Sequence, residues 1–166
     1  GIAGVEGSGQ RELFRAIAGL VQPDSGSLEV GQPVALIPED RSSEALIGSF
    51  SLTENLVLRL GRSGRWIRRG WVDWRAARER TADLLAAHSV QAAGPEATAA
   101  SLSGGNQQRW VIASVGERHP LVLLAENPGR GLDLRAAAAV FARLRSAATN
   151  GAAVIVHLPD LDDLLE

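Results

Sequence analysis

Lysine is absent from this chain, in which all 17 basic residues are arginine. Chemistry that depends on a lysine amine, such as a phosphate-binding lysine or a Schiff base, is therefore excluded within it. Cysteine is absent as well, which excludes disulfides, thiolate nucleophiles and cysteine-ligated zinc. The three histidines, His88, His119 and His157, are too widely separated to show metal-ligand spacing.

The overall amino-acid composition is that of one globular domain. The 166 residues are 45% hydrophobic and 22% charged, which is enough to bury a core. The 17 arginines stand against 19 acidic residues, and a net charge of −2 predicts no overall electrostatic attraction to nucleic acid or to anionic lipid, and no nucleic-acid partner. No apolar run approaches the length of a membrane span. The chain has no methionine and opens within a predicted strand, residues 1–5, which indicates a piece of a longer protein.

Short apolar runs alternate with helical patterns, which predicts an α/β fold with a mostly parallel sheet. We expect a single domain over residues 1–166 with a helical subdomain at about 52–117. Strands are predicted at residues 1–5, 27–30, 34–37, 121–125 and 152–157, and helices at 10–20, 52–60, 71–88, 103–117, 134–148 and 160–166.

Two local details of these helices are predicted. The first helix should bury one face formed by Leu13, Phe14, Ile17 and Leu20. The helix at 52–60 should be capped by Ser51 or Thr53.

A glycine-rich turn stands between the first strand and the first helix, with the glycine spacing of a phosphate-binding loop. Glycines let backbone N–H groups turn inward, and the start of the helix adds positive potential, so together they favour phosphate. The chain departs from the pattern at Gln10, where a lysine would neutralise phosphate, and at Arg11, where a hydroxyl would hold Mg²⁺. The candidate nucleotide-binding residues are Gly4, Gly7, Ser8, Gly9, Gln10 and Arg11. A tight connection between a strand and a helix is the alternative interpretation.

A second motif follows a loop and opens the helix at 103–117. Ser103 is expected to cap this helix, while Gly104 and Gly105 expose backbone N–H groups, which makes an anion site that needs no lysine. The candidate residues of the motif are Leu102, Ser103, Gly104, Gly105, Asn106 and Gln107.

The third motif is the apolar strand at 121–125 and the polar residues that follow it. Glu126 and Asn127 come at its carboxyl end, where α/β sheets place ligand-binding groups. Gly131, Leu132 and Asp133 follow shortly afterwards.

These three motifs, in this order, resemble those of the ATP-binding cassette (ABC) ATPases. The Walker A motif falls at 4–11, the signature loop at 102–107, Walker B at 122–127 and the D-loop at 131–133. The resemblance implies a P-loop NTPase-like fold, truncated at both ends, without the N-terminal strands that carry the adenine-stacking aromatic residue.

The residues of several further stretches indicate one subfamily of these ATPases. Residues 38–41 and 50–55, together with Asn106, resemble the second, C-terminal cassette of tandem ATPase subunits that serve bacterial importers of simple sugars and nucleosides. Residues 54–58 favour the nucleoside branch.

The same resemblance indicates a degenerate catalytic site. The family's Q-loop glutamine aligns with Glu39, its switch histidine with Pro159, and its Walker B aspartate with Glu126, a possible Mg²⁺ ligand. Its catalytic glutamate aligns with Asn127, which can orient a water but cannot accept a proton. Loss of one preorganised group commonly costs roughly 10²–10³ in rate. Hydrolysis in this site is therefore predicted to be negligible, and His157 is expected to be a strand-end histidine without a catalytic role.

The signature loop, by contrast, is preserved. In the family two cassettes close head-to-tail, so that the signature loop of one contacts the nucleotide held by the other. The resemblance thus implies a catalytic cassette as partner, in the same polypeptide or a dimer, with ATP and Mg²⁺ mainly at the partner's site. It also implies transmembrane permease subunits, indirectly a solute-binding protein, and a peripheral location at the cytoplasmic face of the bacterial plasma membrane. The alternatives are an interaction domain that binds no nucleotide and a weakly active ATPase.

Residues 62–71 interleave arginine with tryptophan. This pattern fits a solvated connector with tryptophans that anchor the helical insertion, or a contact with a membrane subunit or lipid headgroups. Single-stranded nucleic acid would also suit the pattern, but the negative net charge and the short length argue against it. Trp74 and Trp110 fall on predicted helices and are expected in the core.

Overall fold

A computed structural model describes residues 7–61, 66–68 and 70–159 of the chain. The strand predicted at 1–5 and the helix predicted at 160–166 lie outside these residues. The chain divides into two compact units, one combining Gly1–Glu39 with His119–Glu166 and the other spanning Asp40–Arg118. The second unit encloses the segment at 52–117, whose assignment as a subdomain stays a prediction. No helix in the described part of the chain has the length and apolar character needed to cross a membrane.

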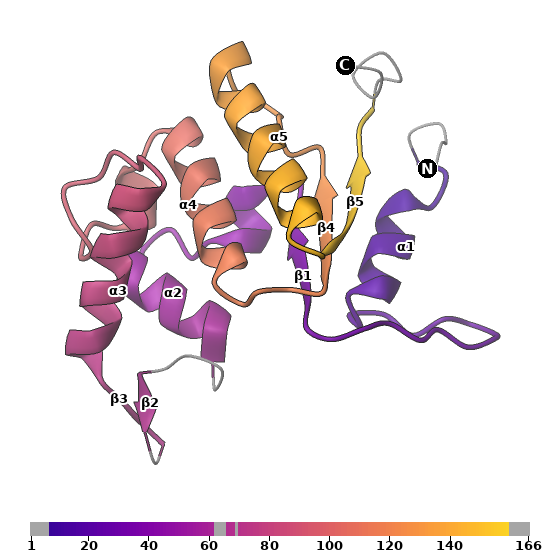
Figure 1. Cartoon of the computed structure of the whole chain (residues 1–166), viewed down its shortest axis with the longest axis horizontal. Helices are drawn as coiled ribbons and strands as arrows, with labels where there is room; N and C mark the ends of the chain where they lie inside the picture. Colours follow the sequence, from indigo (N-terminus) through magenta and orange to yellow (C-terminus); the bar gives the residue numbers. More distant parts are fainter. Residues whose placement is uncertain (1–6, 62–65, 69, 160–166) are drawn as a thin grey trace. The chain divides into compact units, whose positions relative to one another are not determined.

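The first unit is built on a parallel sheet of three strands, β1 (Val34–Ile37), β4 (Val122–Glu126) and β5 (Ala153–His157), in the order β1-β4-β5 (Figure 1). The central strand β4 is apolar because it has a neighbour on each side, and its Leu124 and Ala125 are fully buried. Two helices belong to the same unit, α1 (Gln10–Ile17) and α5 (Leu134–Thr149). The predicted parallel sheet is confirmed, with β1 at the predicted residues and β4 shifted by one.

The first helix is shorter than predicted. It ends at Ile17 because Gly19 adopts a left-handed backbone with φ 74°, and the N–H of Leu20 then bonds to the carbonyl oxygen of Arg15 at 2.8 Å. Phe14 is buried as expected, but Leu20 lies beyond the helix and is 65% exposed.

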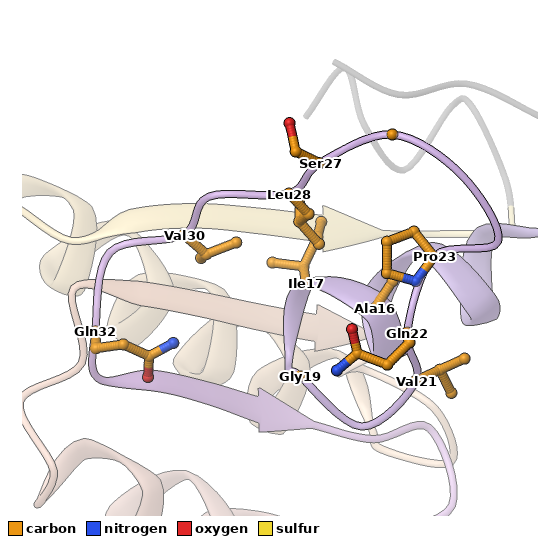
Figure 2. Close-up of a pocket in the computed structure, with 11 residues that line it drawn as sticks. Ala16, Ile17, Gly19, Val21, Gln22, Pro23, Ser27, Leu28, Val30 and Gln32 are labelled. Carbon is orange, nitrogen blue, oxygen red and sulfur yellow. The ribbon is translucent and has the colours of Figure 1, made fainter.

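The strand predicted at 27–30 is wrong. The described residues offer this segment no hydrogen-bonded neighbour, and it runs as an irregular loop. The loop and the end of α1 line an open pocket of about 340 Å³. Figure 2 shows the side chains that line it. Leu28 and Val30, the apolar residues that suggested a strand, line this pocket together with Ile17 of α1.

The second unit is mainly helical. Its elements are η1 (Arg41–Ala45), α2 (Leu52–Leu60), β2 (Ile67–Arg68), β3 (Trp71–Val72), α3 (Trp74–Ala87), η3 (Ala99–Ser101) and α4 (Gly104–Gly116). Helix α4 packs against both α2 and α3. Trp110 and Val111 of α4 are fully buried and form the centre of this unit's core, as predicted for Trp110.

The helix predicted at 71–88 begins three residues late. Gly70, with φ 85°, turns the chain so that β3 pairs antiparallel with β2, and Asp73 then caps α3 by accepting the N–H of Ala76 at 3.1 Å. Trp74 therefore lies at the exposed start of α3 and is 42% exposed, so its predicted place in the core is wrong.

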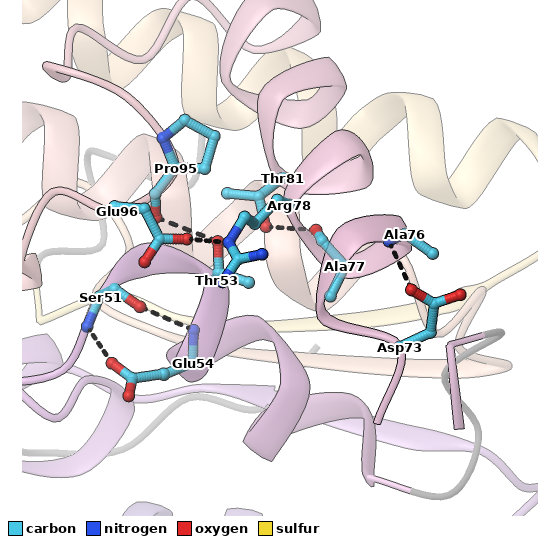
Figure 3. A network of polar contacts seen from close by, with 10 residues as sticks. All are labelled: Ser51, Thr53, Glu54, Asp73, Ala76, Ala77, Arg78, Thr81, Pro95 and Glu96. Atoms are coloured by element: carbon cyan, nitrogen blue, oxygen red, sulfur yellow. Dashed lines mark hydrogen bonds and ion pairs between the residues drawn. The ribbon is translucent and has the colours of Figure 1, made fainter. Parts of the chain in front are cut away.

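Helix α2 begins with the predicted serine cap (Figure 3). The Ser51 hydroxyl accepts the N–H of Glu54 at 3.1 Å, and the Glu54 carboxylate accepts the N–H of Ser51 at 2.7 Å. This reciprocal pair satisfies two N–H groups that the helix itself leaves without partners. Thr53, the other candidate cap, instead donates to the carbonyl oxygen of Pro95.

Replacing Ser51 with alanine is expected to lower the free energy of unfolding by about 1 kcal/mol, because the N–H of Glu54 loses its acceptor. The hydrogen bonds from Ser51 hold the pKa of Glu54 below its usual range. A lowered carboxylate pKa stabilises the fold at neutral pH and loses this effect as the pH falls through it. Ser51→Ala keeps the backbone N–H that is the larger cause of this shift and removes only the contribution of the hydroxyl, so the difference between wild type and Ser51→Ala in urea unfolding should shrink in part at acidic pH. An equal difference at both pH values would contradict a contribution of the hydroxyl to the pKa of Glu54.

Candidate functional site

The glycine turn leads directly into α1. Gly7 and Gly9 adopt left-handed backbones, with φ 84° and 91°, which residues with side chains rarely adopt. Gly9 is the N-cap of α1 and brings no side chain to the helix N-terminus. Gln10 and Arg11 are the first two helical residues. Gly7 and Gly9 thus have the turn that the predicted loop requires, while Gly4 lies outside the described residues and the nucleotide-binding role stays a prediction.

The carboxyl edge of the sheet gathers three of the predicted positions. The Glu39 N–H donates to Glu126 Oε2 at 3.3 Å, and Asn127 Nδ2 donates to Glu39 Oε1 at 3.1 Å. Glu126 is 4% exposed at the end of the central strand. Residues 88 positions apart in sequence therefore form one hydrogen-bonded group, because parallel strands end at the same edge.

Sequence reasoning missed a fourth member of this group, Arg130. Its Nη1 lies 3.1 Å from Glu39 Oε1, so one carboxylate oxygen receives both an amide and a guanidinium. The only sequence signal was a basic residue four positions after Glu126. The carboxylate of Glu39 is therefore held by this chain's own side chains.

Asn127 is also fixed through its backbone. It adopts a left-handed conformation with φ 40°, which asparagine tolerates better than most residues, and its N–H bonds to the carbonyl oxygen of His157 at 2.8 Å. The His157 ring packs edge-on against Phe14, with the ring centroids 6.5 Å apart. Pro159 lies two residues past His157 and is exposed. These contacts place His157 at the end of β5 against Phe14, and its expected lack of a catalytic role stays a prediction.

The D-loop residues lie at the start of α5 and form its N-terminal cap. Asp133 Oδ1 accepts the N–H of Ala136 at 2.8 Å and caps the helix. Gly131 has φ 68° and Leu132 donates to the carbonyl oxygen of Gly129 at 3.1 Å, which turns the chain into this cap.

The donor groups at this site do not fit Mg²⁺. Glu126 receives a backbone N–H, Glu39 is paired with a guanidinium, and Arg11 takes the place of a hydroxyl ligand but cannot bind a cation. Over the described ranges, moreover, no three His, Cys, Asp or Glu side chains lie close enough to hold a metal ion. The predicted metal role of Glu126 thus has no supporting ligand set among the described residues.

The signature loop belongs to the second unit and opens α4. Ser103 is the N-cap by position, but the prediction that its side chain caps the helix is wrong: the hydroxyl accepts Asn106 Nδ2 at 3.0 Å. Asn106 in turn accepts the N–H of Gln91 at 2.9 Å, and Gln107 Nε2 donates to the carbonyl oxygen of Ala99 at 3.0 Å. These side-chain hydrogen bonds thus brace the loop at the N-terminus of α4.

A cation accompanies this helix N-terminus. A Cβ at Gly104 would lie 2.6 Å from Arg41 Nη2, so the guanidinium occupies the space beside that glycine. The packing of η1 on α4 brings Arg41 there from more than 60 residues away. Sequence reasoning did not assign this role to Arg41, because only the packing reveals it.

Solved structures resemble this fold. The dimeric post-hydrolysis structure of the ATP-binding cassette MJ0796, bound to ADP and Pi, matches with TM-score 0.74 and 20% identity over 93% of this chain and 71% of that one. An ATP-binding subunit of an ABC transporter matches with TM-score 0.74 and 22% identity over 97% of this chain and 68% of that one. Together these matches define the fold as that of an ABC ATPase cassette.

The family follows from the sequence comparison: residues 1–130 match the ABC transporter family, and the chain belongs to it. A nucleoside import ATP-binding protein of Lactococcus lactis, NupA, is 35% identical over 99% of this chain and 35% of the relative. A ribose import ATP-binding protein of Rhizobium johnstonii, RbsA 1, is also 35% identical, over 99% of this chain and 35% of the relative. The chain thus spans about a third of the length of these curated relatives.

Proposed function

We propose that this chain is the second, degenerate cassette of the ATP-binding subunit of a bacterial ABC importer for simple sugars or nucleosides. In this role it supplies its signature loop to the ATP site of a partner cassette. The names of the curated relatives, which are ribose and nucleoside import proteins, support the class of importer. The observation that carries the proposal is the contrast between an altered catalytic edge and a preserved signature loop.

The chain's own site lacks the groups that hydrolysis needs. Asn127 stands at the general-base position, and an amide cannot take a proton from water. Gln10 and Arg11 replace the lysine and the hydroxyl of the Walker A loop. Each loss is expected to cost roughly 10²–10³ in rate, so their combination leaves negligible turnover.

The signature loop keeps what a phosphate in a neighbouring site requires. The 13-residue helix α4 presents its N-terminus, Ser103 is exposed, and the Arg41 guanidinium lies against Gly104. All of these groups act through positive potential and hydrogen-bond donation, which stabilise charge that develops on a transferring phosphoryl group.

This function requires partners. The catalytic cassette, within the same polypeptide or as a dimer partner, would hold ATP and Mg²⁺ in the composite site. Transmembrane permease subunits would place the assembly at the cytoplasmic face of the bacterial plasma membrane and couple it to a solute-binding protein.

ATP turnover by the chain alone and with its catalytic partner tests the proposal. We expect background turnover alone, full turnover with the partner, and roughly a 10²–10³-fold loss with Ser103→Arg, which blocks the helix N-terminus. Ser101→Arg is the matched control, because Ser101 is also exposed but lies in η3 before the loop. Turnover by the chain alone at the partnered rate would instead support an active ATPase. Equal turnover in both variants would support an interaction domain that binds no nucleotide.

A further inference from the structure

The side-chain amide of Asn106 is engaged at both of its ends. Its Oδ1 accepts the N–H of Gln91 at 2.9 Å, and its Nδ2 donates to the Ser103 hydroxyl at 3.0 Å. Asn106 is the third residue of α4, and all three residues belong to the helical unit. The amide therefore links the segment that follows α3 to the residue at the N-cap of α4.

The direction of both hydrogen bonds is set by a backbone group. The N–H of Gln91 can only donate, so the carbonyl oxygen of the Asn106 amide must face it. The NH₂ end of the amide then faces Ser103. Because an amide NH₂ has no acceptor, the Ser103 hydroxyl has to accept from it. The backbone at Gln91 thus determines, through Asn106, that the Ser103 oxygen is an acceptor on this side.

A serine hydroxyl that accepts from one side must direct its own hydrogen elsewhere. The Ser103 oxygen takes no N–H of α4, although Ser103 stands at the N-cap. The side chain is exposed, and no acceptor in the described part of the chain receives its O–H. The hydrogen can rotate about the Cβ–Oγ bond, but the approach of the Asn106 amide disfavours every orientation that points toward that amide. Ser103 is therefore held as a hydrogen-bond donor.

We propose that Asn106 is a positioning residue for the proposed ATP chemistry, in which it keeps the Ser103 hydroxyl oriented as a donor toward a phosphate oxygen of the partner's ATP. This inference rests on the proposed function, which places Ser103 in the composite site. The oxygens of an ionised phosphate only accept hydrogen bonds, so a hydroxyl whose hydrogen is taken up within the protein could not bind one. A donor that is already oriented also needs no reorganisation when charge develops on the phosphoryl group.

Asn106→Asp reverses the polarity of this arrangement with almost no change in shape. An aspartate can still accept the N–H of Gln91, but its second oxygen would accept from Ser103 and turn the hydroxyl hydrogen inward. We expect partnered ATP turnover to fall roughly 10²-fold, in kcat more than in KM, because the donor is lost where phosphoryl charge develops.

A double-variant comparison separates the reversed polarity from the added negative charge. Ser103→Ala should itself lower partnered turnover roughly 10²-fold, because it removes the donor. Adding Asn106→Asp to Ser103→Ala should then cost less than about threefold, since no hydroxyl remains to be oriented. The added charge is present in both backgrounds, so only an effect through the hydroxyl differs between them.

Asn106→Ala separates positioning from stability. It deprives the N–H of Gln91 of its acceptor, so urea unfolding should show a larger loss of stability than in Asn106→Asp. The Ser103 hydroxyl can then rotate and still donate, so turnover should fall only about tenfold, less than in Asn106→Asp. A merely structural role of Asn106 would give the two variants the same order in both measurements.

Arg109→Gln is the matched control. Arg109 Nη1 donates to the carbonyl oxygen of Ser89 at 3.2 Å and so supports the same segment after α3 through a hydrogen bond that does not involve Ser103. Its loss should leave partnered turnover unchanged.

Two results would overturn the inference and leave the proposed function intact. One is an equal loss from Asn106→Asp in the wild-type and Ser103→Ala backgrounds, because the effect would then come from charge alone. The other is a lower turnover in Asn106→Ala than in Asn106→Asp. If Ser103→Ala leaves partnered turnover unchanged, the proposed function fails, and the inference fails with it.

Discussion

Replacing Trp110 with alanine is expected to lower the free energy of unfolding by about 3–5 kcal/mol. Trp110 is fully buried at the middle of α4, which packs against both α2 and α3. Removing its ring would leave a cavity that three helices cannot close without losing their own contacts. Urea unfolding, followed by circular dichroism, measures the change.

The indole N–H of Trp110 allows a second, more specific prediction. Trp110 Nε1 is buried and has no hydrogen-bond partner among the described residues. Trp110→Phe therefore removes volume but no hydrogen bond, and it should cost much less than the alanine variant. Trp71→Ala, at an 82% exposed position, should change stability by less than about 0.5 kcal/mol. A loss of similar size in Trp110→Ala and Trp71→Ala would contradict the packing of this core.

The second large effect is expected where Asn127 donates to Glu39 at 3.1 Å. Asn127→Glu would set two carboxylates against each other and is expected to lower the free energy of unfolding by about 1–3 kcal/mol. Adding Glu39→Gln restores a donor and an acceptor with their positions exchanged, so the double variant should recover most of this loss. Urea unfolding of the four proteins gives the coupling energy.

The left-handed backbone of Asn127 requires its own control. Asn127→Gln carries the same backbone cost, with φ 40°, but adds no charge, so its difference from Asn127→Glu isolates the repulsion. Effects of Asn127→Glu and Glu39→Gln that simply add would contradict the hydrogen bond. Turnover of the double variant should stay at background, because Gln10 and Arg11 are unchanged.

Elements with a strong periodic pattern could be predicted from the sequence. The helices α2 and α5 and the strands β1, β4 and β5 lie within a residue of their predicted bounds, because buried apolar runs and serine or aspartate caps define them locally. The family could be predicted as well, since the match over residues 1–130 confirms the motif-based resemblance.

The wrong predictions concern residues whose local structure is determined by contacts with other parts of the chain. The segment at 27–30 has strand-like residues, but the described structure gives it no neighbouring strand. Trp71 continues a helical pattern, yet Gly70 turns it into a hairpin. Ser103 has the ideal residue type for a cap, but Asn106 takes its hydroxyl.

The candidate site also contains some residues that the sequence indicates and others that only the structure reveals. Glu39, Glu126 and Asn127 are indicated through the resemblance to the family, and the structure brings them together because β1 and β4 end at one edge of the sheet, while their roles stay predictions. The ion pair of Arg130 with Glu39 could not be predicted from the sequence, and neither could the placement of Arg41 beside Gly104. Both depend on side-chain reach across packed elements, which no local pattern encodes.

Thermal unfolding with and without millimolar ATP, repeated in the presence of the catalytic partner cassette, tests the central claim most directly. A ligand raises the unfolding temperature only if it binds the folded state. We predict that ATP stabilises this chain only together with its partner and that Ser103→Arg removes the shift while Ser101→Arg keeps it. A shift of equal size in both variants, or no shift with the partner present, would contradict the role of the signature loop.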